Sequence, residues 1–446
     1  MFKTISLPTQ SALLKPPFVF GVATASFQIE GARESRLTCI WDTFCQQANT
    51  IADNSHGDIA CNHVELWQQD VAMIADLAVD AYRLSISWSR ALHQDGTINQ
   101  QGIAFYRNLL TALKARNIKT YVTLYHWDLP QYLEDKGGWL NRDTAYAFAH
   151  YTDLVTQQLT GLVDSYATLN EPFCSAYLGY EIGVHAPGIK SQQAGRQAAH
   201  HLLLAHGLAM RVLRKNCPDI EAGIVLNFSP AYPLTANDSH AATLADQYHN
   251  QWYIQALLTG HYPSLINQLS NDVKPSIAEQ DMAIISQPVD FIGVNYYTRI
   301  HYKNTDNHWF TEANIHDAVV TDMGWEVYPQ GLTELLVSLN QQYQLPKVYI
   351  TENGAAMADT LTNGQVLDYE RVNYYHTHLN AVHEAIEQGV NIQGYFAWSL
   401  MDNFEWAYGY EKRFGMVYIN YQNQQRTLKE SAKQYRAFLK QRNHGC

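Results

Sequence analysis

The chain has no run of basic residues and no apolar segment long enough to cross a bilayer. Its 446 residues include 30 Lys and Arg against 42 Asp and Glu, a net charge of -12, and the acidic residues are scattered rather than blocked. Such a surface offers no positive track for a phosphate backbone or an anionic bilayer. We therefore expect a soluble protein with neither nucleic acid nor membrane as partner. Composition leaves a homo-oligomer open.

Cysteine is also scarce. The six cysteines form no CxxC pair and are too few for a disulfide scaffold; they are Cys39, Cys45, Cys61, Cys174, Cys217 and Cys446. We expect reduced thiols that are mostly packed, with Cys174 a small packing residue. Polar residues and prolines interrupt the first 18 residues before any apolar run develops, so no signal peptide is predicted and a cytoplasmic location is expected.

No Pro, Gly or Ser-rich linker divides the chain, which predicts one domain over residues 1–446. Short runs rich in β-branched and aromatic residues occur eight times, at 18–25, 81–88, 119–125, 164–169, 222–227, 289–295, 347–350 and 392–398. Amphipathic stretches at helical spacing separate them, at 66–77, 102–115, 144–159, 197–213, 246–258, 332–342 and 371–387. Strand therefore alternates with helix along the whole chain.

This alternation predicts an α/β fold with parallel strands, and eight units suffice to close a single (β/α)8 TIM barrel without an exposed edge. An open doubly wound sheet is the alternative. It is less favoured because no GxGxxG motif follows an early strand and because polar residues gather where nearly every run ends. In a barrel, the C-terminal ends of the strands converge on one mouth, where substrates bind.

The residues at these run ends form the predicted rim of the site. They are Gln28 and Glu30; Arg83 and Trp88; His126, Trp127 and Asp128; Asn170 and Glu171; Asn295, Tyr296 and Tyr297; Glu352 and Asn353; and Trp398, Glu405 and Trp406. Carboxylates, amides and imidazole suit sugar hydroxyls, and indole rings suit the C–H face of a pyranose. The set suits a metal poorly, since no HxH or HxxxH spacing recurs, so neither metal nor cofactor is predicted.

Two acidic residues are the candidates for chemistry. Glu171 follows Asn170 and precedes Pro172, and Glu352 follows Thr351 and precedes Asn353. Hydrolysis of an acetal needs a proton for the leaving oxygen and a nucleophile or water at the anomeric carbon, and two carboxyl groups can supply both. Carboxyls about 5 Å apart give retention of configuration, and roughly 6.5–9.5 Å gives inversion. The residues alone leave that distance open.

With these residues in view, the chain resembles glycoside hydrolase family 1, the β-glucosidase family, along nearly its whole length. The similarity is carried by FGVATASFQIEG at 20–31, LSISW at 84–88, TLYHWDLP at 123–130, TLNEP at 168–172, HAPG at 185–188, GVNYYT at 293–298, ITENG at 350–354 and WSLMDNFEW at 398–406. One such triplet would be weak evidence, but all of them in order are specific.

The resemblance assigns roles. Glu171 matches the general acid/base and Glu352 the nucleophile of a retaining mechanism through a covalent glycosyl-enzyme. Asn170 matches the residue that holds the sugar 2-hydroxyl, while Tyr297 and Arg83 match groups that orient the nucleophile and keep it ionised. The resemblance also implies substrate contacts from Gln28, His126, Trp127, Asn295, Trp325, Trp398, Glu405, Trp406 and Phe414.

The expected function is thus a β-glucosidase that releases glucose from aryl or alkyl β-glucosides and cello-oligosaccharides. Glu at position 171 argues against a thioglucosidase, and Glu405 argues against a 6-phosphorylated sugar because its charge would repel the phosphate. Two other classes are weighed against it: a sugar-binding protein that has kept a hydrolase scaffold, and a metal-dependent barrel hydrolase. No carboxylate is missing, which disfavours the first, and ligand spacing disfavours the second.

Overall fold

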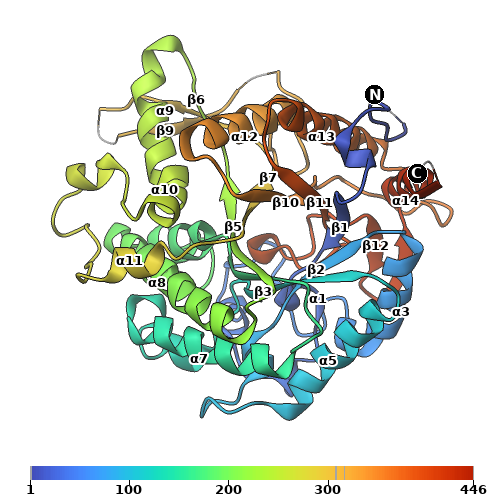
Figure 1. The fold of residues 1–446 in the computed structure, drawn as a ribbon, viewed down its shortest axis with the longest axis horizontal. Coiled ribbons are helices and arrows are strands. Elements are labelled where there is room, and N and C mark those ends of the chain that lie inside the picture. The colour runs from blue at the N-terminus through green and yellow to red at the C-terminus, as the bar shows by residue number, and fades with distance from the viewer. Residues whose placement is uncertain (1–2, 307–308, 316, 445–446) are drawn as a thin grey trace.

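The computed structural model describes residues 3–306, 309–315 and 317–444, so Cys446 lies outside the described residues. Eight parallel strands close a barrel in the order β1-β11-β10-β7-β5-β4-β3-β2, which confirms the predicted fold, and Figure 1 shows helices surrounding it. The barrel strands are β1 (Val19–Ala23), β2 (Ala81–Ser85), β3 (Lys119–Tyr125), β4 (Ser165–Asn170), β5 (Glu221–Phe228), β7 (Phe291–Tyr296), β10 (Lys347–Asn353) and β11 (Ile392–Trp398).

Seven helices follow the predicted amphipathic stretches. They are α3 (His63–Asp76), α5 (Gln100–Lys114), α7 (Asp143–Gln158), α8 (Gln192–Asn216), α10 (Trp252–Thr259), α12 (Pro329–Tyr343) and α13 (Tyr369–Glu387), whereas α9 (Ser239–Asp246) was not predicted. Helix α5 illustrates why they form: Asn99 caps the first turn by accepting from the Gly102 N–H, and Ile103, Tyr106 and Leu110 are buried on one face. Short helices at the loops are α1 (Ser26–Ile29), α2 (Ile40–Cys45), α4 (Trp88–Ala91), α6 (Gln131–Glu134) and α11 (Asp281–Ile285).

A packed column of side chains fills the barrel. Each barrel strand contributes at least one residue to it, including Val19, Ala81, Tyr121, Ala167, Val225, Phe291, Tyr349 and Phe396. The same cluster continues upward to Trp398 and Phe414, with Tyr297 and Trp325 packed against it. The floor of the strand-end mouth is therefore continuous with the rigid interior of the barrel.

Several elements were not predicted. Helix α14 (Glu430–His444) ends the described chain, β12 (Val417–Asn420) pairs with β13 (Gln425–Leu428), and β6 (Ala231–Pro233), β8 (Ile300–Lys303) and β9 (Thr311–Ala313) form a small sheet beside the barrel. Two π-helical segments, η4 (Cys174–Glu181) and η6 (Gln247–Gln251), also occur; the second interrupts the predicted helix 246–258. Among the described residues, no helix combines the length and apolar character needed to cross a bilayer.

A buried cluster of charges ties α14 to the loop that leaves β11. The Asp402 carboxylate accepts from Lys429 Nζ at 2.6 Å and from Arg413 Nη1 at 2.6 Å, while Lys429 and Arg371 both bind Asp359. Lys429 and Asp402 have no exposed side-chain surface. Loss of one partner would leave the others charged and buried, which is the costly case for an ion pair.

Replacing Asp402 with Ala should therefore lower the free energy of unfolding by about 3–5 kcal/mol. The control is Lys347→Ala, which breaks the half-exposed Lys347–Glu221 pair and should change it by less than about 1 kcal/mol. Urea denaturation of both variants measures the difference. Equal effects would show that the buried cluster contributes no more than a surface pair.

Candidate active site

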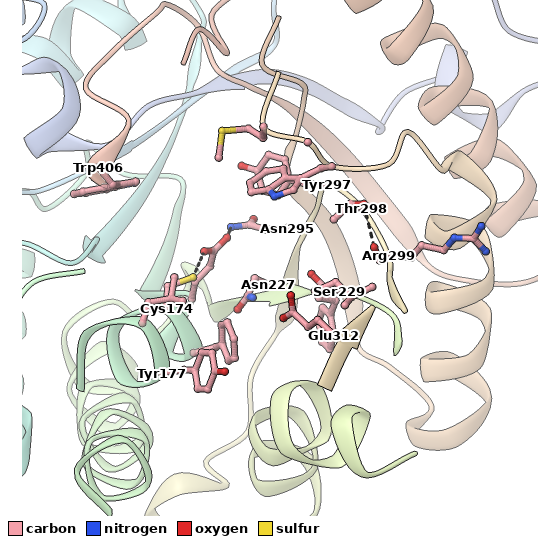
Figure 2. Close-up of a pocket in the computed structure, with 18 of the residues that line it drawn as sticks. Cys174, Tyr177, Asn227, Ser229, Asn295, Tyr297, Thr298, Arg299, Glu312 and Trp406 are labelled. Atoms are coloured by element: carbon pink, nitrogen blue, oxygen red, sulfur yellow. Dashed lines mark hydrogen bonds between the residues drawn. The ribbon is translucent and has the colours of Figure 1, made fainter. Parts of the chain in front are cut away.

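A cavity of about 790 Å³ opens at the C-terminal ends of the barrel strands (Figure 2). Eleven of the predicted site residues line it: His126, Trp127, Glu171, Asn295, Tyr297, Trp325, Glu352, Trp398, Glu405, Trp406 and Phe414. The other three, Gln28, Arg83 and Asn170, lie behind its wall with almost no exposed surface and reach it through hydrogen bonds. The barrel thus brings the whole predicted set together.

Glu171 and Glu352 enter this cavity from different strands. Glu171 directly follows β4, Glu352 lies in β10, and β5 and β7 separate these strands in the barrel. Asn295, from β7, joins the two sides: its Nδ2 donates to Glu171 Oε1, and its Oδ1 accepts from Thr351 Oγ1 at 2.7 Å, one residue before Glu352. A molecule in the cavity therefore meets both carboxyls.

Glu352 is surrounded by donors. Arg83 Nη1 donates to its Oε1 at 2.7 Å and the Tyr297 hydroxyl to its Oε2 at 2.6 Å. Burial raises the pKa of Glu352, while the positive charge and hydrogen bond of Arg83 and the hydroxyl of Tyr297 act in the opposite direction. Both donors favour the ionised carboxylate, which is the form that can attack a carbon atom.

Glu171 has the opposite environment. Burial and the nearby charge of Glu352 raise the pKa of Glu171 to about 8, against the hydrogen bonds from Cys174 and Asn295. Its carboxyl is therefore protonated at neutral pH. Burial raises the pKa of both carboxyls, but Arg83 and Tyr297 favour the ionised form of Glu352, whereas the charge of Glu352 favours the protonated form of Glu171. This contrast is the one that acid catalysis next to a nucleophile requires.

Asn170 is held in one orientation, and it fixes His126 in turn. Its Oδ1 accepts from Arg83 Nη2 at 2.7 Å and from Asn295 Nδ2 at 3.1 Å, so its Nδ2 must donate to His126 Nε2, at 3.0 Å. Burial and the charge of Arg83 lower the pKa of His126 well below its ordinary value, so the ring is neutral and its proton lies on Nδ1. Among the described residues Nδ1 has no partner, which leaves a donor for a ligand.

Gln28 and Glu405, together with Asn170 and His126, form the part of the site that we call its polar end. Gln28 Nε2 donates to Asn403 Oδ1 and to the Phe404 carbonyl, both at 2.9 Å, while its buried Oε1 has no partner in the part of the chain described. Burial and the charges of Glu352 and Glu171 raise the pKa of Glu405 to about 8. The protonated form of this carboxyl is therefore favoured at neutral pH, so the charge argument against a phosphate is weaker than the sequence indicated.

Aromatic rings form the remaining walls. Trp398 stacks on His126 with ring centroids 5.9 Å apart, and Trp406 lies 4.5 Å from Trp127. The Trp127 indole N–H donates to the Asn170 carbonyl at 2.9 Å, so this residue offers a ligand its ring and not its donor. The ring of Trp325 lies 5.4 Å from that of Tyr297 and 6.1 Å from that of Phe414, and it packs against the same cluster as Trp398.

The backbone at the site is unusual in three places. Trp127, Glu171 and Trp406 have φ values of 76°, 47° and 49°, in the left-handed region that side chains other than glycine rarely adopt. Gly354 allows a further close approach, because a Cβ atom there would lie 1.7 Å from the Trp398 carbonyl oxygen. Trp127, Glu171 and Trp406 all line the cavity, and such strained conformations are typical of functional sites.

Besides Gln28, Arg83 and Asn170, five more residues predicted at the rim do not line the cavity, and for these the prediction is wrong: Glu30, Trp88, Asp128, Tyr296 and Asn353. Glu30 binds Arg90 and Tyr106, and Trp88 begins α4 and stacks on Tyr151. The other three hydrogen-bond to neighbouring protein groups, as when Asn353 Nδ2 donates to the Tyr296 carbonyl at 2.7 Å. A polar or aromatic residue at a strand end can support the loop instead of the ligand.

Sequence reasoning also missed part of the cavity wall. The residues it missed include Cys174, Tyr177, Ile182, Val184, Asn227, Ser229, Glu312 and Val320 (Figure 2). Asn227 could have been found, since it ends the fifth predicted strand. Most of the others lie on η4 or on the segment around β9, where no strand-end rule applies. Cys174, expected to be packing only, donates a hydrogen bond from Sγ to Glu171 Oε2 at 3.0 Å.

Within the described residues, no group of three or more His, Cys, Asp and Glu side chains is arranged to hold a metal ion. The chemistry that the site presents is that of its carboxyls. A parallel (β/α)8 barrel with two carboxyls in contrasting environments at a cavity rich in hydrogen-bonding and aromatic groups defines a barrel enzyme equipped for acetal hydrolysis.

Comparison with known proteins agrees. The family model described as glycosyl hydrolase family 1 matches residues 10–444, and the chain belongs to this family of O-glycosyl hydrolases. It is 43% identical, over 98% of each chain, to a protein named β-glucosidase from Agrobacterium sp.. It is 40% identical, over 95% of this chain and 97% of the relative, to a bifunctional β-D-glucosidase/β-D-fucosidase from Bifidobacterium breve. The solved GH1 β-glucosidase of Exiguobacterium antarcticum superposes with a TM-score of 0.93 at 39% identity, covering 96% of this chain and 99% of that one.

Proposed function

We propose that the protein is a retaining β-glucosidase that removes terminal β-D-glucosyl residues by double displacement. The observation that carries the proposal is the contrast within the carboxyl pair. Arg83 and Tyr297 donate to Glu352, whereas burial and the neighbouring charge keep a proton on Glu171. The names of the relatives support the same activity.

In the first step, a Glu352 oxygen attacks the anomeric carbon while the Glu171 proton passes to the glycosidic oxygen. The C–O bond to the aglycone breaks, and a glucosyl ester of Glu352 forms. Glu171, now ionised, removes a proton from water. The resulting hydroxyl oxygen bonds to the anomeric carbon, Glu352 leaves as carboxylate, and glucose is released with Glu171 protonated again.

The polar end of the cavity would hold the glucosyl ring. Gln28 Oε1 and His126 Nδ1 are buried and lack partners among the described residues, so they are suited to accept from and donate to sugar hydroxyls. Glu405 can do both, Trp398 and Trp406 supply flat walls, and Asn170 would hold the 2-hydroxyl. Trp127, Asn295 and Phe414 complete the enclosure, with Trp325 toward the leaving group. The bifunctional relative suggests that fucosides are also accepted.

One catalytic domain spanning residues 1–446 and a cytoplasmic location remain predictions from the sequence, and a homo-oligomer remains open.

A slow substrate should identify the nucleophile. Incubation with a 2-deoxy-2-fluoro β-glucoside bearing a good leaving group should leave one 2-fluoroglucosyl ester on Glu352, because fluorine destabilises the positive charge needed for its hydrolysis. Peptide mass spectrometry locates the label, and Glu352→Gln is the control that should carry none. A label on another residue, or turnover without any label, would remove Glu352 from this role.

The proton donor is tested by the leaving group. Glu171→Ala should lower kcat/KM for cellobiose and alkyl glucosides by about 10²–10⁴-fold, since their leaving oxygens need a proton. With 2,4-dinitrophenyl β-glucoside the loss in the glycosylation step should be far smaller, because that phenolate leaves unprotonated. Glu171→Gln, which keeps the shape of the side chain, is the matched variant and should behave alike. Equal losses on both substrates would contradict the role of Glu171.

The mouth of the cavity is apolar, which bears on the aglycone. Eleven large hydrophobic side chains are exposed in the described part of the chain, and five of them line this cavity: Ile182, Val184, Ile315, Val320 and Tyr408. Deeper in the same wall, Phe173 and Tyr177 stack with centroids 5.0 Å apart. Such a gathering of exposed apolar groups is typical of a binding surface and favours aryl or alkyl aglycones over a sugar.

A series of alkyl glucosides from methyl to octyl tests this preference, since their leaving groups have nearly equal pKa values. We expect kcat/KM to rise about 2- to 4-fold per methylene until the mouth is filled. In the Val320→Ser variant, kcat/KM should rise less with the length of the alkyl chain. Val319→Ser is the control, because Val319 is 75% exposed and does not line the cavity. A flat series in the wild type, with cellobiose the better substrate, would contradict an apolar leaving-group site and leave the glucosidase activity intact.

A further inference from the structure

The π-helical segment η4 places the thiol of its first residue, Cys174, beside Glu171, the proposed acid/base. Glu171 has a left-handed backbone, the chain turns through Pro172 and Phe173, and η4 begins at Cys174. The Cys174 Sγ lies 3.0 Å from Glu171 Oε2, and Figure 2 shows this hydrogen bond at the cavity wall. Asn295 Nδ2 donates to the other oxygen, Oε1. Both oxygens of the Glu171 carboxyl are therefore held.

The thiol is a permanent donor. Burial and the charge of Glu171 raise the pKa of Cys174 well above its ordinary value, so the sulfur keeps its proton throughout the pH range in which the carboxyls titrate. An S–H group beside an ionised carboxylate can only donate to it. The contact therefore stabilises the ionised form of Glu171 more than the protonated form.

Other charged and titratable groups act on Glu171 at the same time. Glu352 from β10 favours its protonated form, and Arg83 from β2 favours its ionised form. The charges of Glu352 and Glu405 also act on the Cys174 thiol. The phenols of Tyr297 and Tyr253 lie near these groups. Against this background, Cys174 and Asn295 are the two residues in the described part of the chain that donate hydrogen bonds to the Glu171 carboxyl.

We propose that Cys174 is a positioning residue, whose S–H···O bond fixes the plane of the Glu171 carboxyl and favours its ionised form in the water-activating half of the cycle. The proposal rests on the acid/base role proposed for Glu171. That residue must give up a proton in one step and accept one in the next, and burial alone would favour the protonated state too strongly for the second step.

The pH dependence of kcat/KM is the test. Glu171 must be protonated for the first step, so activity falls as the pH rises through its pKa. Cys174→Ala removes a donor to the carboxylate, which raises that pKa and should move the basic limb upward by about half a pH unit. Cys174→Ser keeps a donor of similar size, so its basic limb should lie at or below that of the wild type.

Controls separate this effect from altered packing. Cys217→Ala removes a thiol at the end of α8, before β5 and at the opposite end of the barrel, and should leave the profile unchanged. With 2,4-dinitrophenyl β-glucoside, whose leaving group needs no proton, Cys174→Ala should lose its shift relative to the wild type. Cys174→Val fills the volume without a donor and replaces Cys174→Ala if that variant does not fold.

The outcomes are distinct. A basic limb that moves upward in Cys174→Ala or Cys174→Val but not in Cys174→Ser supports the proposal. Equal limbs in all variants, or the same shift in Cys174→Ser as in Cys174→Ala, would overturn it. Titration of the ¹³C-labelled Glu171 carboxyl by NMR gives the same comparison without turnover. If the wild type hydrolyses no β-glucoside at all, the proposed function fails instead, and the NMR titration still decides whether the thiol holds the carboxyl.

Discussion

Two carboxyl groups beside one cavity repel each other when both are ionised, and the buried charge of Arg83 limits that repulsion. Arg83 reaches from β2 across the barrel mouth and donates to Glu352 and to Asn170. Its charge lies against Glu352, so the ionised form is favoured at Glu352 more than at Glu171. The division of roles that we propose for the two glutamates rests on this ion pair. Removing that charge would disturb the states of both carboxyls.

The same guanidinium organises groups that carry no charge. Because Arg83 and Asn295 both donate to Asn170 Oδ1, the Asn170 amide must donate to His126, and His126 must present its own N–H to the cavity. Four strands, β2, β3, β4 and β7, take part in this chain of hydrogen bonds. The packed side chains inside the barrel fix the positions of these strands relative to one another. They therefore also hold the hydrogen-bonded groups of the site in place.

The fold and the polar end of the site could be predicted because both follow from strand ends. Eight runs of strand character gave the barrel, and residues such as Glu171, Asn295 and Glu352 lie where those runs stop. The same rule included Glu30 and Asn353 wrongly, since a strand-end residue can turn back to hold its loop. It also missed Cys174 and Tyr177, because a π-helical segment has no periodicity that the sequence displays.

The part of the cavity wall built from strand ends and the part built around η4 and β9 have different consequences for specificity. The glucosyl end is built from strand ends, where a shift of one residue would disturb barrel pairing and the hydrogen bonds around Arg83 together. The proposed leaving-group end is built from η4 and the segments beside η4 and β9, where exposed side chains such as Ile182 and Val320 line the cavity. A substitution at such an exposed position changes what the mouth contacts without touching the carboxyl pair. On the proposed function, aglycone preference can thus vary independently of the chemistry, whereas the buried Cys174, at the first residue of η4, contacts Glu171 itself.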